Sequence, residues 1–128
     1  MTEQSWKWVA IDVVLAIHDR QLAEHGGGSG TRDRGLIESA LARPQQLAAY
    51  GNPDVAALAA AYAIGIAKNH GFVDGNKRTA WVVCRLFLAL NGSDLQFDKV
   101  EAVKVVEKVA AGEMVEAEFA EWLRVRIQ

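Results

Sequence analysis

The chain has one cysteine and no excess of positive charge. A single cysteine, Cys84, cannot form a disulfide within the chain, and its place in an apolar run indicates a small buried hydrophobic side chain. The 14 Lys and Arg residues are outnumbered by 16 Asp and Glu residues, so the formal net charge is −2 at pH 7. Such a chain lacks the broad positive field that non-specific binding to nucleic acids requires. We therefore expect no direct contact with DNA or RNA as the main function.

Long hydrophobic runs are missing as well. The uninterrupted apolar run from Val55 to Ala67 is shorter than the roughly 20 residues that cross a bilayer. The N-terminal segment carries Glu3 and Asp12, and it lacks the basic start and the small-residue cleavage site of a signal peptide. We predict a protein that is neither exported nor membrane-bound. A cytoplasmic location also fits the unpaired cysteine.

Proline is rare, and no linker separates two halves of the chain. The 128 residues suit one domain that covers residues 1–128, and apolar residues recur at helical spacing along its length. The predicted fold class is therefore all-α, a compact domain of about six helices. The expected helices begin near residue 11 and end at the glycines 26–28, run over 34–42, from 53 to His70, from 77 to Asn91, over 98–111, and around 119–127.

Helix boundaries follow from local signals. Pro44 restricts the residue before it, so the second helix is predicted to stop there and QLAAYGNPD to form an irregular connector. Asn52 is the expected N-cap of the third helix, with Pro53 at its first position and Asp54 near the positive end of its dipole. The body of that helix is apolar on all sides, which predicts a central, buried helix.

Two C-terminal helices carry apolar stripes. In the helix over residues 98–111, the expected buried face contains Val100, Val103, Val106 and Val109. In the last helix, the expected buried face contains Phe119, Trp122, Leu123, Val125 and Ile127. Both helices are expected to pack one side against the rest of the domain.

The stretch HGFVDGNKRTAW, residues 70–81, interrupts two apolar helical segments with polar groups. Asn76 to Arg78 open the second of these helices, and the free amides and dipole of a helix N-terminus favour an anion. Gly75 permits a sharp turn and close approach of the backbone to a ligand. Lys77 and Arg78 add the charges that bind phosphate. The stretch therefore predicts a phosphate site.

Two further side chains of this stretch suggest catalysis. Asp74 supplies a carboxylate beside the predicted phosphate site, and Mg²⁺ is commonly held by one or two carboxylates together with substrate phosphates. His70 closes the preceding helix and can accept a proton from an attacking hydroxyl. Phe72 is the exception, because an aromatic side chain in such a loop is expected to enter the core and hold the loop's shape.

Each residue also has a structural interpretation. A histidine at a helix end often compensates the dipole, and an Asp-Gly pair is usually a turn. Four such coincidences within nine residues favour a functional site. Elsewhere, His18 and His25 lack metal-ligand spacing and are expected to be solvated or capping, and GGGSG is expected to be a flexible connector.

The motif HGFVDGNKRTA resembles the signature of the Fic/Doc family, and in particular its Doc branch, the death-on-curing toxins of bacterial toxin–antitoxin pairs. The upstream segments HDRQLAEHGG and RDRGLIESALARPQ also resemble the Doc pattern, so the resemblance covers nearly the whole chain. It implies a compact helical fold that binds ATP with Mg²⁺ and modifies a hydroxyl of a target protein.

The resemblance implies a role for each residue of the motif. His70 would be the general base, and Asp74 would bind Mg²⁺. The implied catalytic residues are His70, Asp74, Asn76, Lys77 and Arg78. The residues implied to bind the nucleotide are Gly75, Asn76, Lys77 and Arg78.

The resemblance leaves two reactions open. Doc-type proteins share the Asn-Lys-Arg variant and act as kinases, which pass the γ-phosphate of ATP to a threonine of elongation factor Tu and arrest translation. Most Fic enzymes transfer AMP, and they carry a proline at the position of Gly71, a glycine at that of Lys77 and a second arginine at that of Trp81. We expect a kinase, with AMP transfer as the alternative and a non-catalytic helical binding module as a third interpretation.

Regulation is expected to come from a partner. Many Fic proteins carry an inhibitory helix in which a glutamate follows a serine or threonine by four positions, and this chain has no such pair. The resemblance implies a small antitoxin that inserts a helix into a groove of the toxin.

Overall fold

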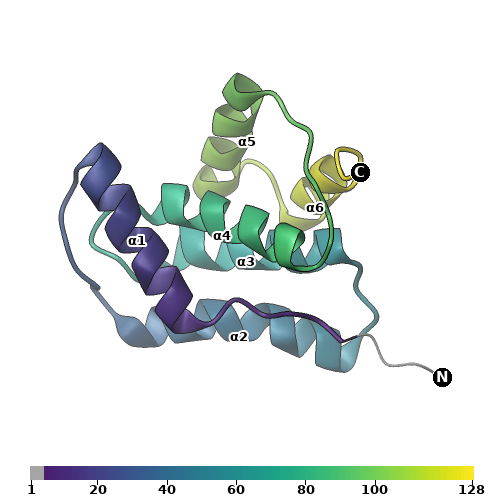
Figure 1. Ribbon diagram of the computed structural model, residues 1–128, viewed down its shortest axis with the longest axis horizontal. Helices are drawn as coiled ribbons and strands as arrows, with labels where there is room; N and C mark the ends of the chain where they lie inside the picture. Colours follow the sequence, from purple (N-terminus) through teal and green to yellow (C-terminus); the bar gives the residue numbers. More distant parts are fainter. Residues whose placement is uncertain (1–4) are drawn as a thin grey trace.

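The computed structural model describes residues 5–128, and within them it contains six α-helices and two isolated β-bridges but no strand (Figure 1). This confirms the predicted all-α class. The helices are α1 (Ile11–His25), α2 (Arg34–Tyr50), α3 (Val55–Asn69), α4 (Asn76–Leu90), α5 (Lys99–Ala111) and α6 (Glu116–Arg124). Over the same residues, no helix has the length and hydropathy that a membrane span requires.

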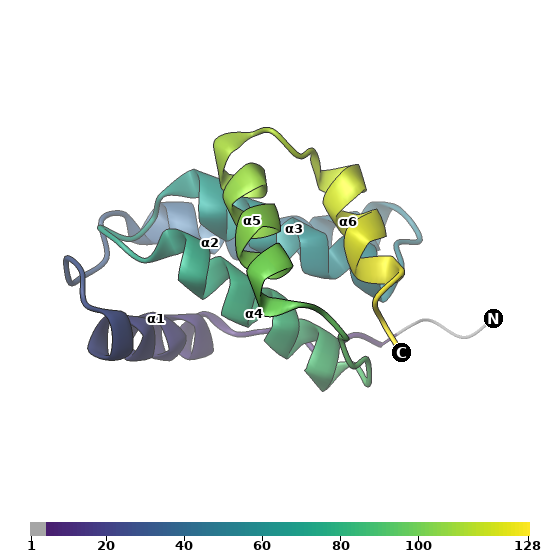
Figure 2. The ribbon, with the colours of Figure 1, turned by 90° about the horizontal axis from the view of Figure 1, so that it is seen from above.

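Helix α3 is the centre of the domain, as its all-round apolar sequence predicts. It packs against α2, α4, α5 and α6, and Figures 1 and 2 show these helices arranged around it. Ten of its fifteen residues are buried, and Leu58 and Tyr62 are fully enclosed. The Tyr62 hydroxyl accepts a hydrogen bond of 3.0 Å from the backbone N–H of Val9, which ties the N-terminal segment to the core. With about 22 Å of length, α3 carries the chain from one end of the domain to the other.

Small side chains let α2 and α3 lie close together. A Cβ atom at Gly65 would be 3.1 Å from the Cβ of Ala40 and 3.2 Å from its backbone atoms Cα and O. Both residues are buried. The alanine-rich and glycine-containing sequence of α3 therefore sets the distance between the two helices.

The predicted end of the second helix is wrong. Helix α2 continues through Pro44 to Tyr50, so most of the expected connector QLAAYGNPD is helical. Proline inside a helix removes one backbone hydrogen bond and crowds the preceding turn. Here the ring of Pro44 is fully buried and Leu47 packs against the core, so tertiary burial outweighs the local preference.

The predicted start of α3 is also wrong. The N-cap is Asp54, whose Oδ1 accepts a hydrogen bond of 2.9 Å from the N–H of Ala57, while Asn52 and Pro53 precede the helix. Arg124 of α6 donates to the same carboxylate at 2.6 and 3.0 Å. The hydrogen bond from Arg124 is the main cause that lowers the pKa of Asp54. One side chain thus caps α3 and joins it to α6.

The predicted buried face of the fifth helix is wrong at three of its four valines. Helix α5 buries Ala102, Val105 and Val109, whereas Val100 and Val103 are 63% and 60% exposed and Val106 is half-buried. Valines lie on both sides of this helix, so spacing alone does not identify the packed side. In α6, Phe119 and Leu123 are buried as predicted, and Trp122 is half-buried. The predicted end of this helix near residue 127 is wrong: it ends at Arg124, so Val125, which is exposed, and Ile127, which is half-buried, follow the helix.

The prediction for Cys84 is confirmed. The side chain is completely buried in α4, and this burial raises the pKa of the thiol to about 12. A thiol in this position is protonated at neutral pH. It serves as a small core side chain.

Replacing Gly65 tests the close contact between α2 and α3. We expect Gly65→Leu to lower the free energy of unfolding by about 1–3 kcal/mol, because the added side chain meets the backbone of Ala40. Urea denaturation measures this change. The matched control is Gly51→Leu, since Gly51 is exposed and its Cβ would meet no atom closer than 3.4 Å. Equal losses in both variants would contradict the assigned contact.

Candidate functional site

The polar stretch forms a loop, residues 70–75, between the end of α3 and the start of α4. His70 is the C-cap of α3, with φ 54° and ψ 45°, and it is the only non-glycine residue of 5–128 with positive φ. A left-handed conformation is uncommon for a residue with a side chain. The conformation turns the chain out of the buried helix, and the exposed imidazole borders the cavity described below.

Asn76 and Phe72 hold the loop together. The side-chain Oδ1 of Asn76 accepts from the backbone N–H of Phe72 at 3.1 Å, and its Nδ2 donates to the backbone carbonyl of Phe72 at 3.1 Å. The ring of Phe72 is 1% exposed, which confirms the predicted plug into the core. Both polar atoms of the Asn76 carboxamide therefore bond the loop backbone. The backbone amide of Asn76 is the first amide of α4.

A second anchor of the loop comes from α1. His18 was expected to be solvated or capping, and that expectation is wrong: its side chain is 2% exposed. Its ring stacks on Phe72 with centroids 3.7 Å apart, and its Nε2 lies 2.8 Å from the backbone carbonyl of Asp74. The signal was present in the sequence, since His18 follows Val14 by four positions and so lies on the same face of α1. His25, in contrast, is exposed at the end of the helix.

The glycine-rich segment after α1 packs against the same loop. The backbone N–H of Val73 donates to Gly30 at 3.2 Å, and residues 31 and 72 form an isolated β-bridge. A Cβ at Gly27 would lie 2.8 Å from Oδ2 of Asp74. The sequence predicted only a flexible connector here. Because glycines have no side chains, the backbone of this segment can instead lie directly against the motif loop.

Asp74 is held by backbone amides. Its Oδ1 accepts from the N–H of Gly75 at 2.8 Å, and its Oδ2 accepts a longer hydrogen bond of 3.4 Å from Gly28. The hydrogen bond from Gly75, followed by that from Gly28, lowers the pKa of the carboxyl below its usual value, and the charge of Arg78 acts in the same direction. The side chain is exposed and is therefore an ionised carboxylate at neutral pH.

The start of α4 offers free donors. Gly75 is the N-cap, with φ 78°, and no side chain caps this end. In the described part of the chain, the backbone N–H groups of Asn76, Lys77 and Arg78 have no hydrogen-bond acceptor. Amides at the positive end of a helix dipole bind anions, phosphate included.

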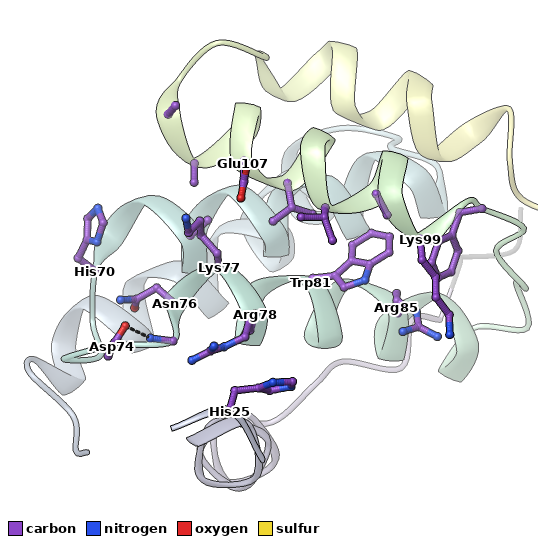
Figure 3. A pocket seen from close by; sticks show the side chains of 18 of the residues that line it. His25, His70, Asp74, Asn76, Lys77, Arg78, Trp81, Arg85, Lys99 and Glu107 are labelled. Atoms are coloured by element: carbon purple, nitrogen blue, oxygen red, sulfur yellow. Dashed lines mark hydrogen bonds between the residues drawn. The ribbon is translucent and has the colours of Figure 1, made fainter. Parts of the chain in front are cut away.

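Two cations stand beside these amides. Lys77 is exposed on the cavity side of α4 (Figure 3). Arg78 is half-buried, and its guanidinium donates to the backbone carbonyl of Gly26 at 3.2 Å. Its Nε is buried and has no hydrogen-bond partner within residues 5–128. Arg78 is thus partly fixed by the segment after α1, whereas Lys77 projects freely.

The motif opens into a cavity of about 1250 Å³ between α4 and α5. Figure 3 shows the motif at one end, Trp81 in the middle, and Arg85 and Lys99 at the other end. The ring of Trp81 packs edge-on against Phe97 with centroids 5.2 Å apart. The facing wall belongs to α5 and includes two of the three valines misassigned to the core, Val103 and Val106, together with Ala102 and Ala110.

All six predicted site residues line this cavity: His70, Asp74, Gly75, Asn76, Lys77 and Arg78. The carboxylate of Asp74 stands at the motif end, and that of Glu107 on α5 also lines the cavity (Figure 3). In residues 5–128, no three His, Cys, Asp or Glu side chains gather at one point as metal ligands. One exposed carboxylate beside an anion site fits Mg²⁺ that is shared with phosphate oxygens and water.

A family model and two known proteins match this chain over segments that include the motif. The model of the Fic/DOC family matches residues 8–88, which include the loop, α1 and most of α4. The chain is 33% identical over 117 residues to "Protein kinase doc" of Escherichia phage P1, covering 91% of this chain and 92% of that protein. It is 43% identical over 90 residues to "Toxin Doc" of Mycolicibacterium smegmatis, covering 66% of this chain and 68% of that protein.

Truncating Asn76 tests its role in the loop. Asn76→Ala leaves the N–H and the carbonyl of Phe72 without their partners, so we expect the free energy of unfolding to fall by about 1–3 kcal/mol. The change is measured by thermal or urea denaturation. Asn52→Ala is the matched control, because Asn52 is exposed and precedes α3. A variant at position 76 that is as stable as this control would show that the two hydrogen bonds do not shape the loop.

Proposed function

The chain belongs to the Fic/Doc family, and from this premise we propose that it is a Doc-type toxin that transfers the γ-phosphate of ATP to a hydroxyl of a target protein. The observation that carries the proposal is the meeting of a histidine, an ionised carboxylate and a helix N-terminus without a side-chain cap at one end of a single cavity. A binding surface alone gives no reason for these three groups to meet.

The start of α4 is the proposed seat of the phosphates. The free amides of residues 76–78, Lys77 and Arg78 supply partial and full positive charges on one side of the cavity. A triphosphate needs several donors at once, and arginine and backbone amides suit phosphate oxygens. Asp74, next to the N-cap Gly75, would hold Mg²⁺ beside the phosphates. The ion, when bound, would neutralise charge on the phosphate oxygens.

His70 is the proposed general base. As the hydroxyl oxygen of the target forms its bond to the γ-phosphorus, the bond between that phosphorus and the oxygen bridging to the β-phosphate breaks and ADP leaves. The imidazole of His70 accepts the proton that the hydroxyl loses. Its position at the mouth of the cavity, outside the buried helix, suits a group that must meet a second protein.

The choice of the γ-phosphate rests on the motif variant and on the relatives. The phage P1 relative bears the name of a protein kinase. This chain has Lys77 where the AMP-transferring members have glycine, and that long cation lines the cavity. We further propose, from the resemblance to Doc, that the target is a translation factor such as elongation factor Tu, modified at a threonine.

The proposed regulator is a small antitoxin that acts in trans. The relative from M. smegmatis is named a toxin. By resemblance to the Doc branch, we propose that the antitoxin inserts a helix into a groove of this chain. Exposed apolar side chains along α5, among them Val103, offer the kind of surface that such a helix buries.

Labelled ATP tests the reaction. The purified protein is incubated with Mg²⁺, elongation factor Tu and ATP labelled at either the γ- or the α-phosphate. We expect γ-label on the target, and we expect His70→Ala to lower its rate of transfer by about 10²–10⁴-fold. Arg20→Ala is the control, because Arg20 is exposed and paired only with Glu24. Transfer of α-label would mean AMP transfer. If neither label is transferred to any protein when a bacterial lysate replaces elongation factor Tu, the proposed enzymatic activity is contradicted.

A pair of lysines tests the phosphate seat. Lys77→Ala and Lys104→Ala remove the same charge, but only Lys77 lines the cavity, since Lys104 is exposed elsewhere on α5. We expect Lys77→Ala to raise the KM for ATP by about tenfold and Lys104→Ala to leave it unchanged. Steady-state kinetics with varied ATP provides the measurement. An equal effect of both substitutions would mean that only net charge matters.

A further inference from the structure

His18 is a buried histidine that the proposed reaction does not use. It lies on α1, 56 residues before Asp74 in sequence, and its side chain has no access to the cavity. Its ring stacking and its hydrogen bond are both with the motif loop: the ring stacks on Phe72, with an angle of 9° between the planes, and Nε2 lies 2.8 Å from the carbonyl oxygen of Asp74. If His18 only filled space in the core, its partners could lie anywhere in the core. Both partners, Phe72 and Asp74, belong to the motif loop.

We propose that His18 is the positioning residue of the site, which fixes the peptide unit between Asp74 and Gly75 and thereby aims the Asp74 carboxylate and the first amides of α4. The proposal deepens the function given above and rests on it for its catalytic consequence. It requires no reaction at His18 itself.

The hydrogen-bond pattern determines the proton on the ring. A backbone carbonyl only accepts, so Nε2 must carry a proton and donate it to Asp74 at 2.8 Å. The donor is enclosed, because His18 is 2% exposed and the stacked ring of Phe72 is 1% exposed. Water therefore cannot replace this donor, and the carbonyl depends on His18 alone among the described side chains.

The peptide unit after Asp74 is held at both of its polar ends. Its carbonyl accepts from His18, and its N–H, which belongs to Gly75, donates to the carboxylate Oδ1 of Asp74 at 2.8 Å. A peptide is planar, so fixing the carbonyl also fixes the direction of the N–H. The carboxylate bound to that N–H is thus oriented by His18 through the backbone.

The same peptide unit leads into α4. Gly75 is the N-cap in a left-handed conformation, and the free amides of residues 76–78 follow it directly. A rotation of the unit would redirect both the carboxylate and the turn into the helix. His18 therefore orients the carboxylate and the turn into α4 without touching a ligand, while Lys77 and Arg78 hold the phosphates independently of it.

Two substitutions separate the ring from the donor. His18→Phe retains an aromatic ring to stack on Phe72 but has no N–H, whereas His18→Gln retains an amide N–H near the position of Nε2 and loses the ring. We expect His18→Phe to lower kcat for phosphate transfer by about 10–100-fold with little change in the KM for ATP, because Lys77 and Arg78 remain. We expect His18→Gln to recover at least about tenfold of that loss.

Val14→Ala is the control for stability. Val14 is fully buried on the same face of α1, one helical turn before His18. Its truncation weakens the packing of α1 without touching the loop, so we expect a lower Tm and an unchanged kcat. A fall in kcat as large as that of His18→Phe would assign the effect to α1 packing and overturn the proposal. An activity of His18→Gln equal to that of His18→Phe would also overturn it.

Hydrogen exchange tests the positioning without the reaction. The amide of Gly75 donates to the carboxylate of Asp74, and the amide of Val73 donates to the carbonyl of Gly30 in the segment after α1. We expect both amides to exchange about tenfold faster in His18→Phe, with the exchange of α3 unchanged. Unchanged exchange in the loop would overturn the proposal whatever the activity. If the native protein transfers no phosphate but the loop amides respond as expected, the proposed function fails and the positioning role stands.

Discussion

The backbone of the motif loop must find its hydrogen bonds inside the protein, and most of the site depends on this constraint. The loop joins α3 and α4, two helices that are buried along much of their length, and its residues 71, 72 and 75 are buried as well. Unpaired buried peptide groups are costly. Partners come from three separate parts of the chain: the side chain of His18, the backbone of residues 30–33, and the side chain of Asn76.

This constraint divides the motif into residues that shape the loop and residues that remain available. Phe72 and Asn76 shape the loop, since the ring of Phe72 enters the core and the side chain of Asn76 bonds the backbone of Phe72. His70, Lys77 and the amides at the start of α4 keep their polar groups free and face one cavity. Asp74 belongs to both sets, because its carboxylate accepts from backbone amides and still has exposed oxygen. The free groups are those that the proposed phosphate transfer requires.

The packing around α3 explains where the cavity lies. Small residues bring α2 close to α3 on one side, while α5 contributes alanines and valines that do not close the space above α4. The side of α5 that carries Val103 is left without an intramolecular partner over part of its length. The helices thus carry the motif, with its carboxylate and its two cations, at one end of a largely apolar groove, and Arg85 and Lys99 stand at the other end.

The sequence by itself determined the all-α class, the central helix and the residues of the motif. Each of these is a local property, carried by helical periodicity, by residue volume or by consecutive side chains. Tertiary structure decided what depends on distant partners. Burial carried α2 through Pro44, Arg124 helped to make Asp54 the cap of α3, and packing chose Val105 over Val103 on α5. It also turned His18 from an expected surface group into an anchor, because its partners, Phe72 and Asp74, lie more than fifty residues away and only the folded chain brings them together.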